Sequence, residues 1–130
     1  MTYYRYLGHN YDVKVVATYI VIAGGINEEQ AEDEAWKRLQ PIFEKKDEDI
    51  KDVELETDKI EYHGFGKYHV WINAICLAKV TAKNDENAVE IAEALVRKID
   101  YPNCMARIGC DGEVAEMEYE PALDIILEDE

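Results

Sequence analysis

Two apolar runs rich in β-branched residues, each followed at once by the start of a helix, constrain the fold of this chain more than any other feature. Residues 13–23 and 70–80 are such runs, and both predict buried strands. Asn27 follows the first run and Asn84 follows the second. Carboxylates come directly after each asparagine, as is favoured at a helix N-terminus. The chain is therefore expected to repeat one strand-helix plan.

Each expected helix leads into a half-exposed strand. The first helix spans residues 28–40, and Pro41 is expected to kink or restart it. The second helix carries an apolar stripe that ends at Ile99, before Pro102. Residues 52–62 and the end of 108–120 then alternate apolar and acidic side chains, which is the pattern of strands with one face in water.

The resulting order, βαββαβ, predicts an α+β protein with a ferredoxin-like sandwich: an antiparallel four-stranded sheet, two helices on one face, and N- and C-terminal extensions. The two most apolar strands are expected at the centre of the sheet and the two acidic strands at its edges. The chain length fits one domain, residues 1–130, with similar internal halves at residues 13–62 and 70–119.

Charge limits the partners that the chain can bind. The 29 Asp and Glu residues against 14 Lys and Arg residues give a formal net charge of -15, which repels phosphate backbones and anionic membrane surfaces. The acidic C-terminal segment, residues 111–130, contains no Lys or Arg. We therefore expect a basic, neutral or apolar partner and no direct contact with nucleic acid or membrane.

No motif in the sequence assigns chemistry. The glycines at residues 24–25 and 64–66 lack the spacing of a phosphate-binding loop. His63 and His69 flank an expected turn, and the three cysteines lack a C-x-x-C spacing, so we assign no metal site and no disulfide framework. We expect no catalytic residues and no cofactor. Because no run of about 18 apolar residues occurs, we expect a cytoplasmic protein.

The two expected central strands are apolar on both faces, although two helices can cover only one of them. The second face would form an apolar patch too large for a comfortable monomer surface. This face could be covered in three ways: by the protein's own ends, by a second subunit in a homodimer, or by a partner protein. The side chains of this predicted sheet-face interface are Val16, Ile20, Ile22, Trp71, Ile75 and Leu77.

Two rows of carboxylates on the acidic strands suggest a function. Side chains two apart on a strand are separated by about 6.6 Å, which gives roughly half the axial charge density of one DNA strand. Such rows could enter the basic channel of a DNA-binding protein. The predicted partner-binding residues are Glu54, Glu56 and Asp58 in one row and Glu116, Glu118 and Glu120 in the other.

We therefore expect a non-enzymatic acidic interaction protein that inhibits a basic nucleic-acid-binding protein as a nucleic-acid mimic. Its general character resembles that of phage anti-defence proteins. A simpler interpretation is that charged edge strands prevent aggregation and that acidity supports solubility. The alternative function is a ferredoxin-like small-ligand or sensory module, with a pocket on the sheet face lined by Trp71, Tyr19 and the N-terminal tyrosines.

Overall fold

The computed structural model describes the backbone of residues 2–127 and the side chains of residues 8–117. In this part of the chain, the protein is α+β, with two α-helices and a four-stranded antiparallel sheet. The elements follow in the order β1 (Thr2–Gly24), α1 (Glu28–Leu39), the 3-10 helix η1 (Gln40–Lys45), β2 (Ile50–Tyr62), β3 (Lys67–Ala82), α2 (Asp85–Arg97) and β4 (Met105–Leu127).

The strands lie in the order β2-β3-β1-β4, and each neighbouring pair is antiparallel. The two most apolar strands, β1 and β3, are therefore central, and the acidic strands β2 and β4 are at the edges, as the sequence predicts. The arrangement is compatible with a ferredoxin-like fold.

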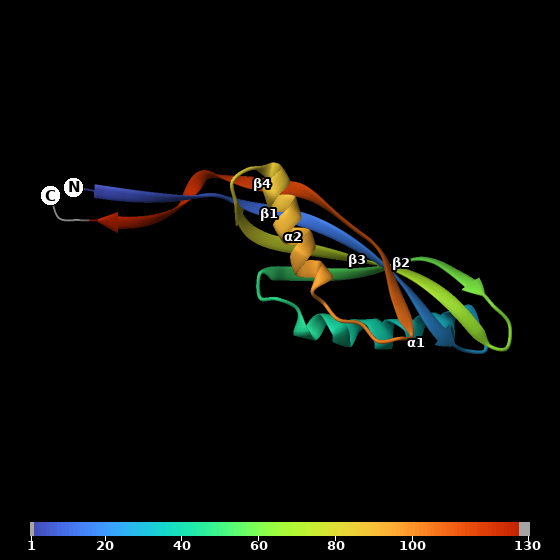
Figure 1. The fold of residues 1–130 in the computed structure, drawn as a ribbon. Helices are drawn as coiled ribbons and strands as arrows, with labels where there is room; N and C mark the ends of the chain where they lie inside the picture. The colour runs from blue at the N-terminus through green and yellow to red at the C-terminus, as the bar shows by residue number, and fades with distance from the viewer. Residues whose placement is uncertain (1, 128–130) are drawn as a thin grey trace.

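β1 and β4 are much longer than expected. The sequence places the first strand at residues 13–23 and the fourth at residues 108–120, whereas the structure pairs β1 with β4 from Val21 and Met105 out to Thr2 and Leu127. Figure 1 shows this two-stranded part extending beyond the helices. Local patterning missed it, because each strand finds its hydrogen-bonding partner at the other end of the chain.

Asparagine caps begin both helices, as predicted. Oδ1 of Asn27 accepts a hydrogen bond from the backbone N of Gln30 at 2.8 Å, and Oδ1 of Asn84 accepts one from the backbone N of Asn87 at 2.8 Å. The expected restart at Pro41 is also present, because α1 passes there into η1.

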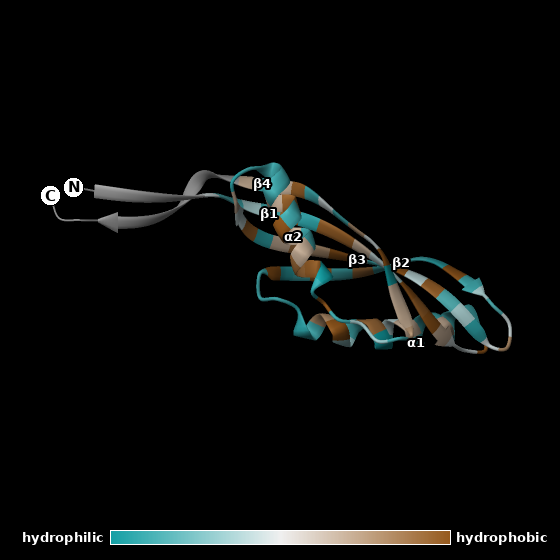
Figure 2. Cartoon of the chain, viewed as in Figure 1, coloured by the Kyte–Doolittle hydropathy of each residue, from teal (hydrophilic) through white to brown (hydrophobic). Residues whose placement is uncertain are grey.

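Both helices pack against β1 and β3, and only one face of these central strands is fully buried. On β3, every second side chain from Tyr68 to Ala82 is buried. Hydrophobic residues recur along the central strands in Figure 2. Within the described residues, no helix has both the length and the apolar character needed to cross a bilayer.

Candidate functional site

The face of the sheet that the helices leave uncovered is called the open face below. It carries an apolar strip, because its side chains alternate with the fully buried ones of β1 and β3. The side chains of the strip are half-buried, except for Ile22, which is 41% exposed. The strip consists of the residues of the predicted sheet-face interface: Val16, Ile20, Ile22, Trp71, Ile75 and Leu77.

Carboxylates of both edge strands border the apolar strip. Residues that pair across antiparallel strands share a face, so the register places Glu54 beside Ile75 and Asp111 beside Val16 on the open face. Ile75 also pairs with Val16, so these four side chains form one row across all four strands. A neighbouring row consists of Asp52, Leu77, Lys14 and Glu113.

The register of β2 against β3 places two of the three residues in the predicted carboxylate row on β2. Glu54 and Glu56 lie on the open face, next to β3. Asp58 has no cross-strand partner in this register, because the pairing with β3 shifts between Thr57 and Lys59. The extra residue of such a bulge has no partner on the neighbouring strand.

Of the predicted carboxylate row on β4, one residue, Glu116, has a described side chain. Glu116 pairs with Asp12 and therefore shares the open face with it. The side chains of Glu118 and Glu120 lie outside the described residues.

Asp52, Asp111 and Glu113 belong to the site although the sequence did not identify them. Only the register of the edge strands against β1 and β3 shows that these side chains border the strip. Within residues 8–117, the structure records no ion pair for any of these three or for Glu54 and Glu56. We call Asp52, Glu54, Glu56, Asp111 and Glu113 the acidic margins.

A hollow of about 440 Å³ lies in the open face at the end of the sheet where Asp52 and Glu54 border the strip. It receives residues from all four strands, with carboxylates on the β2 side and aliphatic side chains on the β3 side. Lys14 of β1 also lines the hollow, but the two carboxylates of Asp52 and Glu54 outweigh its single positive charge. Such a net-negative lining suits a side chain with an apolar stem and a cationic head, as in Lys or Arg. The hollow is lined by Lys14, Asp52, Val53, Glu54, Ile75, Cys76, Leu77 and Ala115.

The other end of the open face, near the hairpin between β2 and β3, is aromatic and carries charges of both signs, with Lys59 and Glu61 3.5 Å apart. Nζ of Lys59 lies 4.2 Å from the ring centroid of Trp71. The imidazole rings of His63 and His69 stack with their centroids 3.8 Å apart. In the described part of the chain, no group of three His, Cys, Asp or Glu side chains is placed to hold a metal ion.

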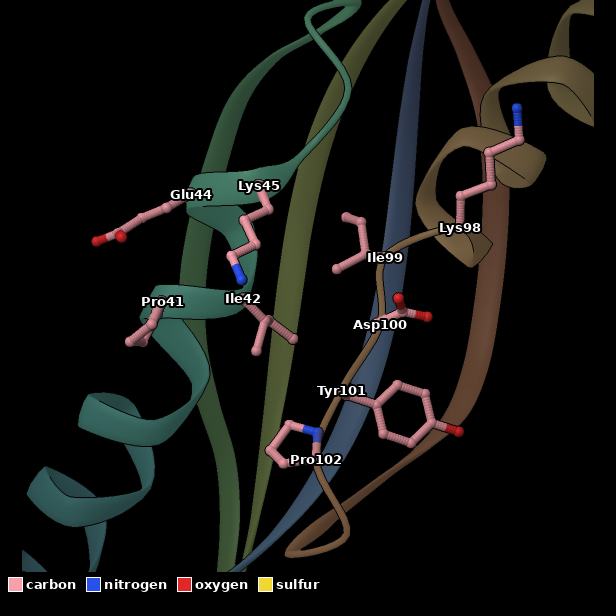
Figure 3. A pocket seen from close by; sticks show the side chains of 9 residues that line it. All are labelled: Pro41, Ile42, Glu44, Lys45, Lys98, Ile99, Asp100, Tyr101 and Pro102. Carbon is pink, nitrogen blue, oxygen red and sulfur yellow. The ribbon is translucent and has the colours of Figure 1, made fainter.

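Figure 3 shows a second cavity, of about 440 Å³, between η1 and the connection from α2 to β4. The side chains of Ile42 and Ile99 face each other across it, and Tyr101 continues the wall on the connection. Charged residues of both signs, including Lys45 and Asp100, complete the lining.

The ligand pocket predicted on the sheet face is wrong in one respect. Tyr19 pairs with Ile72 and is fully buried on the helix side, whereas the next pair along the strands, Ile20 with Trp71, faces the open side. Because successive residues of a strand point to opposite faces, Tyr19 and Trp71 cannot line one pocket. The side chains of the tyrosines at residues 3, 4 and 6 lie outside the described residues.

Burial lowers the reactivity of two cysteines and one tyrosine among the described residues. It raises the pKa of Cys76 to about 12, and the charge of nearby Cys110 adds to this shift. Burial also raises the pKa of Cys110 and of Tyr19, although Arg107 opposes the shift at Tyr19. The thiolate is the reactive form of cysteine, so these two buried thiols are poor nucleophiles at neutral pH.

The backbone at both ends of the described chain continues the pairing of β1 with β4 instead of folding back over the apolar strip (Figure 1). The described backbone of residues 2–127 therefore leaves the open face uncovered. Compared with known proteins, the chain matches no protein-family model, no curated protein and no solved structure.

Proposed function

We propose that the protein is a non-enzymatic acidic interaction protein with a ferredoxin-like sandwich fold, and that it binds a basic protein through its open face. The observation that carries this proposal is the cross-strand register, which sets carboxylates of β2 and β4 on either side of the apolar strip. An apolar centre with a charged rim is the usual anatomy of a protein-protein interface. The strip supplies contact area, and the margins supply steering and selectivity.

The basic surface of a nucleic-acid-binding protein is the partner that we favour. The acidic margins are separated by three strand spacings, about 14 Å, which is comparable with the ~12 Å width of the DNA major groove. Lysines and arginines that neutralise phosphates would meet carboxylates at a similar separation. The net charge of -15 would speed their encounter. Under this proposal, the protein inhibits its cytoplasmic partner by occupying the nucleic-acid site.

The test is capture of partners from a lysate of the source cells on immobilised protein, with elution in a salt gradient. We expect a basic nucleic-acid-binding protein that elutes as salt rises, because salt screens exposed charges. Added duplex DNA should displace it as well. The double variant Glu54→Lys/Glu56→Lys should lose this partner. Its matched control, Glu44→Lys/Glu90→Lys, makes the same charge change at exposed positions on η1 and α2 and should retain it.

Two outcomes contradict the proposal. Retention that does not respond to salt would show that the margins do not drive binding. Equal loss in both double variants would show that total charge matters and that the open face does not.

The cavity in Figure 3 favours a second candidate function, the binding of a small ligand. Its volume of about 440 Å³ is within the usual range of ligand pockets. Its apolar walls and charged rim would suit a small amphipathic molecule. A ligand from a small-molecule library should then perturb the amide NMR signals of residues 98–101 and leave Trp71 fluorescence unchanged. The variant Ile42→Trp should abolish the effect by filling the cavity. Binding that survives Ile42→Trp would contradict this assignment.

A further inference from the structure

The dimensions of the open face indicate which structural element fits it. From Val16 to Ile22, the apolar strip is about 20 Å long at ~3.3 Å per residue, and the acidic margins are about 14 Å apart. An α-helix is about 10–12 Å wide with its side chains, and ~13 residues of helix are about 20 Å long. One such helix, laid along β1 and β3, would cover the strip and leave its flanks above both margins.

Two other occupants fit this face less well. A second copy of the chain would bring acidic margins towards acidic margins, in a protein that already has a net charge of -15. A single extended strand is narrow, because neighbouring strands lie only about 4.8 Å apart, so it could not reach both margins from the centre of the strip. Shape and charge together favour a helix with cationic flanks.

We infer that the open face binds an amphipathic α-helix of the basic partner. Apolar residues spaced i, i+3, i+4 and i+7 contact the strip, and Lys or Arg residues on the flanks lie over Glu54 on one side and Asp111 on the other. The hollow beside Ile75 accepts one of the long cationic side chains. This inference rests on the proposed function and specifies the element through which the partner is recognised.

Three labelled peptides of about 14 residues test the inference by fluorescence anisotropy. One is a Leu/Lys helix with leucines at i, i+3, i+4 and i+7. The second has the same composition but alternates Leu and Lys, which is the pattern of a strand. The third is the corresponding Leu/Glu helix. We expect the Leu/Lys helix to bind more tightly than either of the others by about ten-fold or more.

Variants of the protein locate the binding surface. Ile75→Asp, in the strip, and Glu54→Lys/Glu56→Lys, in the β2 margin, should each weaken binding of the Leu/Lys helix by about ten-fold or more. The matched controls are Ile26→Asp, at a side chain that is 86% exposed outside the open face, and Glu44→Lys/Glu90→Lys. Both controls should bind normally. If Ile75→Asp unfolds the sheet, Glu54→Lys/Glu56→Lys, at exposed positions, still tests whether the peptide binds this surface.

The outcomes separate this inference from the proposed function. Equal binding of the helical and alternating Leu/Lys peptides overturns the helix and leaves a basic partner possible, because the two peptides carry the same charge. Failure of the Leu/Lys helix to bind also overturns the inference, while the salt-dependent capture experiment still judges the proposed function. Tight binding by the Leu/Glu helix would contradict both.

Discussion

Arg107 connects the C-terminal end of α2 to β4. Its guanidinium donates hydrogen bonds to the backbone oxygens of Val96 at 3.3 Å, Arg97 at 2.9 Å and Ile99 at 3.1 Å. It also lies 5.2 Å from the ring centroid of Tyr101. The last carbonyl groups of a helix lack intrahelical partners, although the Val96 oxygen also accepts a hydrogen bond from the backbone N of Ile99 at 3.1 Å. Arg107 therefore caps α2 from a neighbouring strand.

Replacing Arg107 with methionine would remove these hydrogen bonds and keep most of the apolar stem. A hydrogen bond from a charged donor contributes about 1.5 kcal/mol net, so three would contribute about 4.5 kcal/mol if they were fully buried. The side chain is only half-buried, and water can replace part of the loss. We therefore expect Arg107→Met to lower the free energy of unfolding by about 2–3 kcal/mol. Arg107→Lys should cost about 1–2 kcal/mol, because lysine keeps the charge without the planar fork.

Urea denaturation followed by circular dichroism measures these losses, provided that the slope against urea is unchanged. Arg97→Met is the matched control, because the exposed Arg97 side chain makes only a 3.4 Å hydrogen bond to the Cys110 carbonyl and a 3.5 Å ion pair with Glu93 among the described residues. It should cost less than about 1 kcal/mol. A loss below about 0.5 kcal/mol for Arg107→Met, or equal losses in the two variants, would refute the capping role.

Three further predictions concern backbone strain, thiol reactivity and pH. Phe65 is 99% exposed at a φ of 55°, so Phe65→Asn should stabilise the protein by about 0.5–1 kcal/mol. Gly64→Ala should destabilise the protein, because Gly64 has a φ of 86°. Thermal unfolding of the two variants checks both predictions, and a Phe65→Asn protein less stable than the parent contradicts the reasoning. Because burial raises the pKa of Cys76 to about 12, mass spectrometry after brief alkylation near pH 8 should find label on half-buried Cys104 first, and the reverse order contradicts this. The folded protein then retains a thiol proton that the unfolded chain loses, so the free energy of unfolding should fall between pH 9.0 and about 12. Urea titrations at several pH values across this range measure that fall. In Cys76→Ala, the free energy of unfolding should decrease less with pH, and the same decrease as in the parent contradicts the assignment.

Features that depend on local sequence were predictable. Asn27 and Asn84 cap their helices through residues three positions away, so a few letters of sequence suffice. The apolar strip could also be predicted from the alternation within residues 13–23 and 70–80, because neighbouring strand residues point to opposite faces. These signals predicted the central strands and the apolar character of both their faces.

Features that depend on pairing between distant strands were not predictable. Asp111 joins the acidic margins because it pairs with Val16, and bulges along β1 and β4 set that register. The same dependence applies to Asp58, which a bulge in β2 leaves without a partner on β3. The alternation of β1 did predict that Tyr19 faces the helices, so its assignment to a pocket with Trp71 conflicted with a signal already present in the sequence.

The two tryptophans offer the most direct test of the open face, because they lie on different sides of the protein. Trp71 is in the apolar strip, whereas Trp36 is on α1 and donates a hydrogen bond from Nε1 to Oγ1 of Thr57 at 2.9 Å. The variant Trp36→Phe leaves Trp71 as the fluorescent reporter, and Trp71→Phe leaves Trp36. Titration with the Leu/Lys helix should shift Trp71 emission to shorter wavelengths with saturation and leave Trp36 emission unchanged. A saturable response from Trp36 with none from Trp71 would place the partner on the helix side and contradict the account.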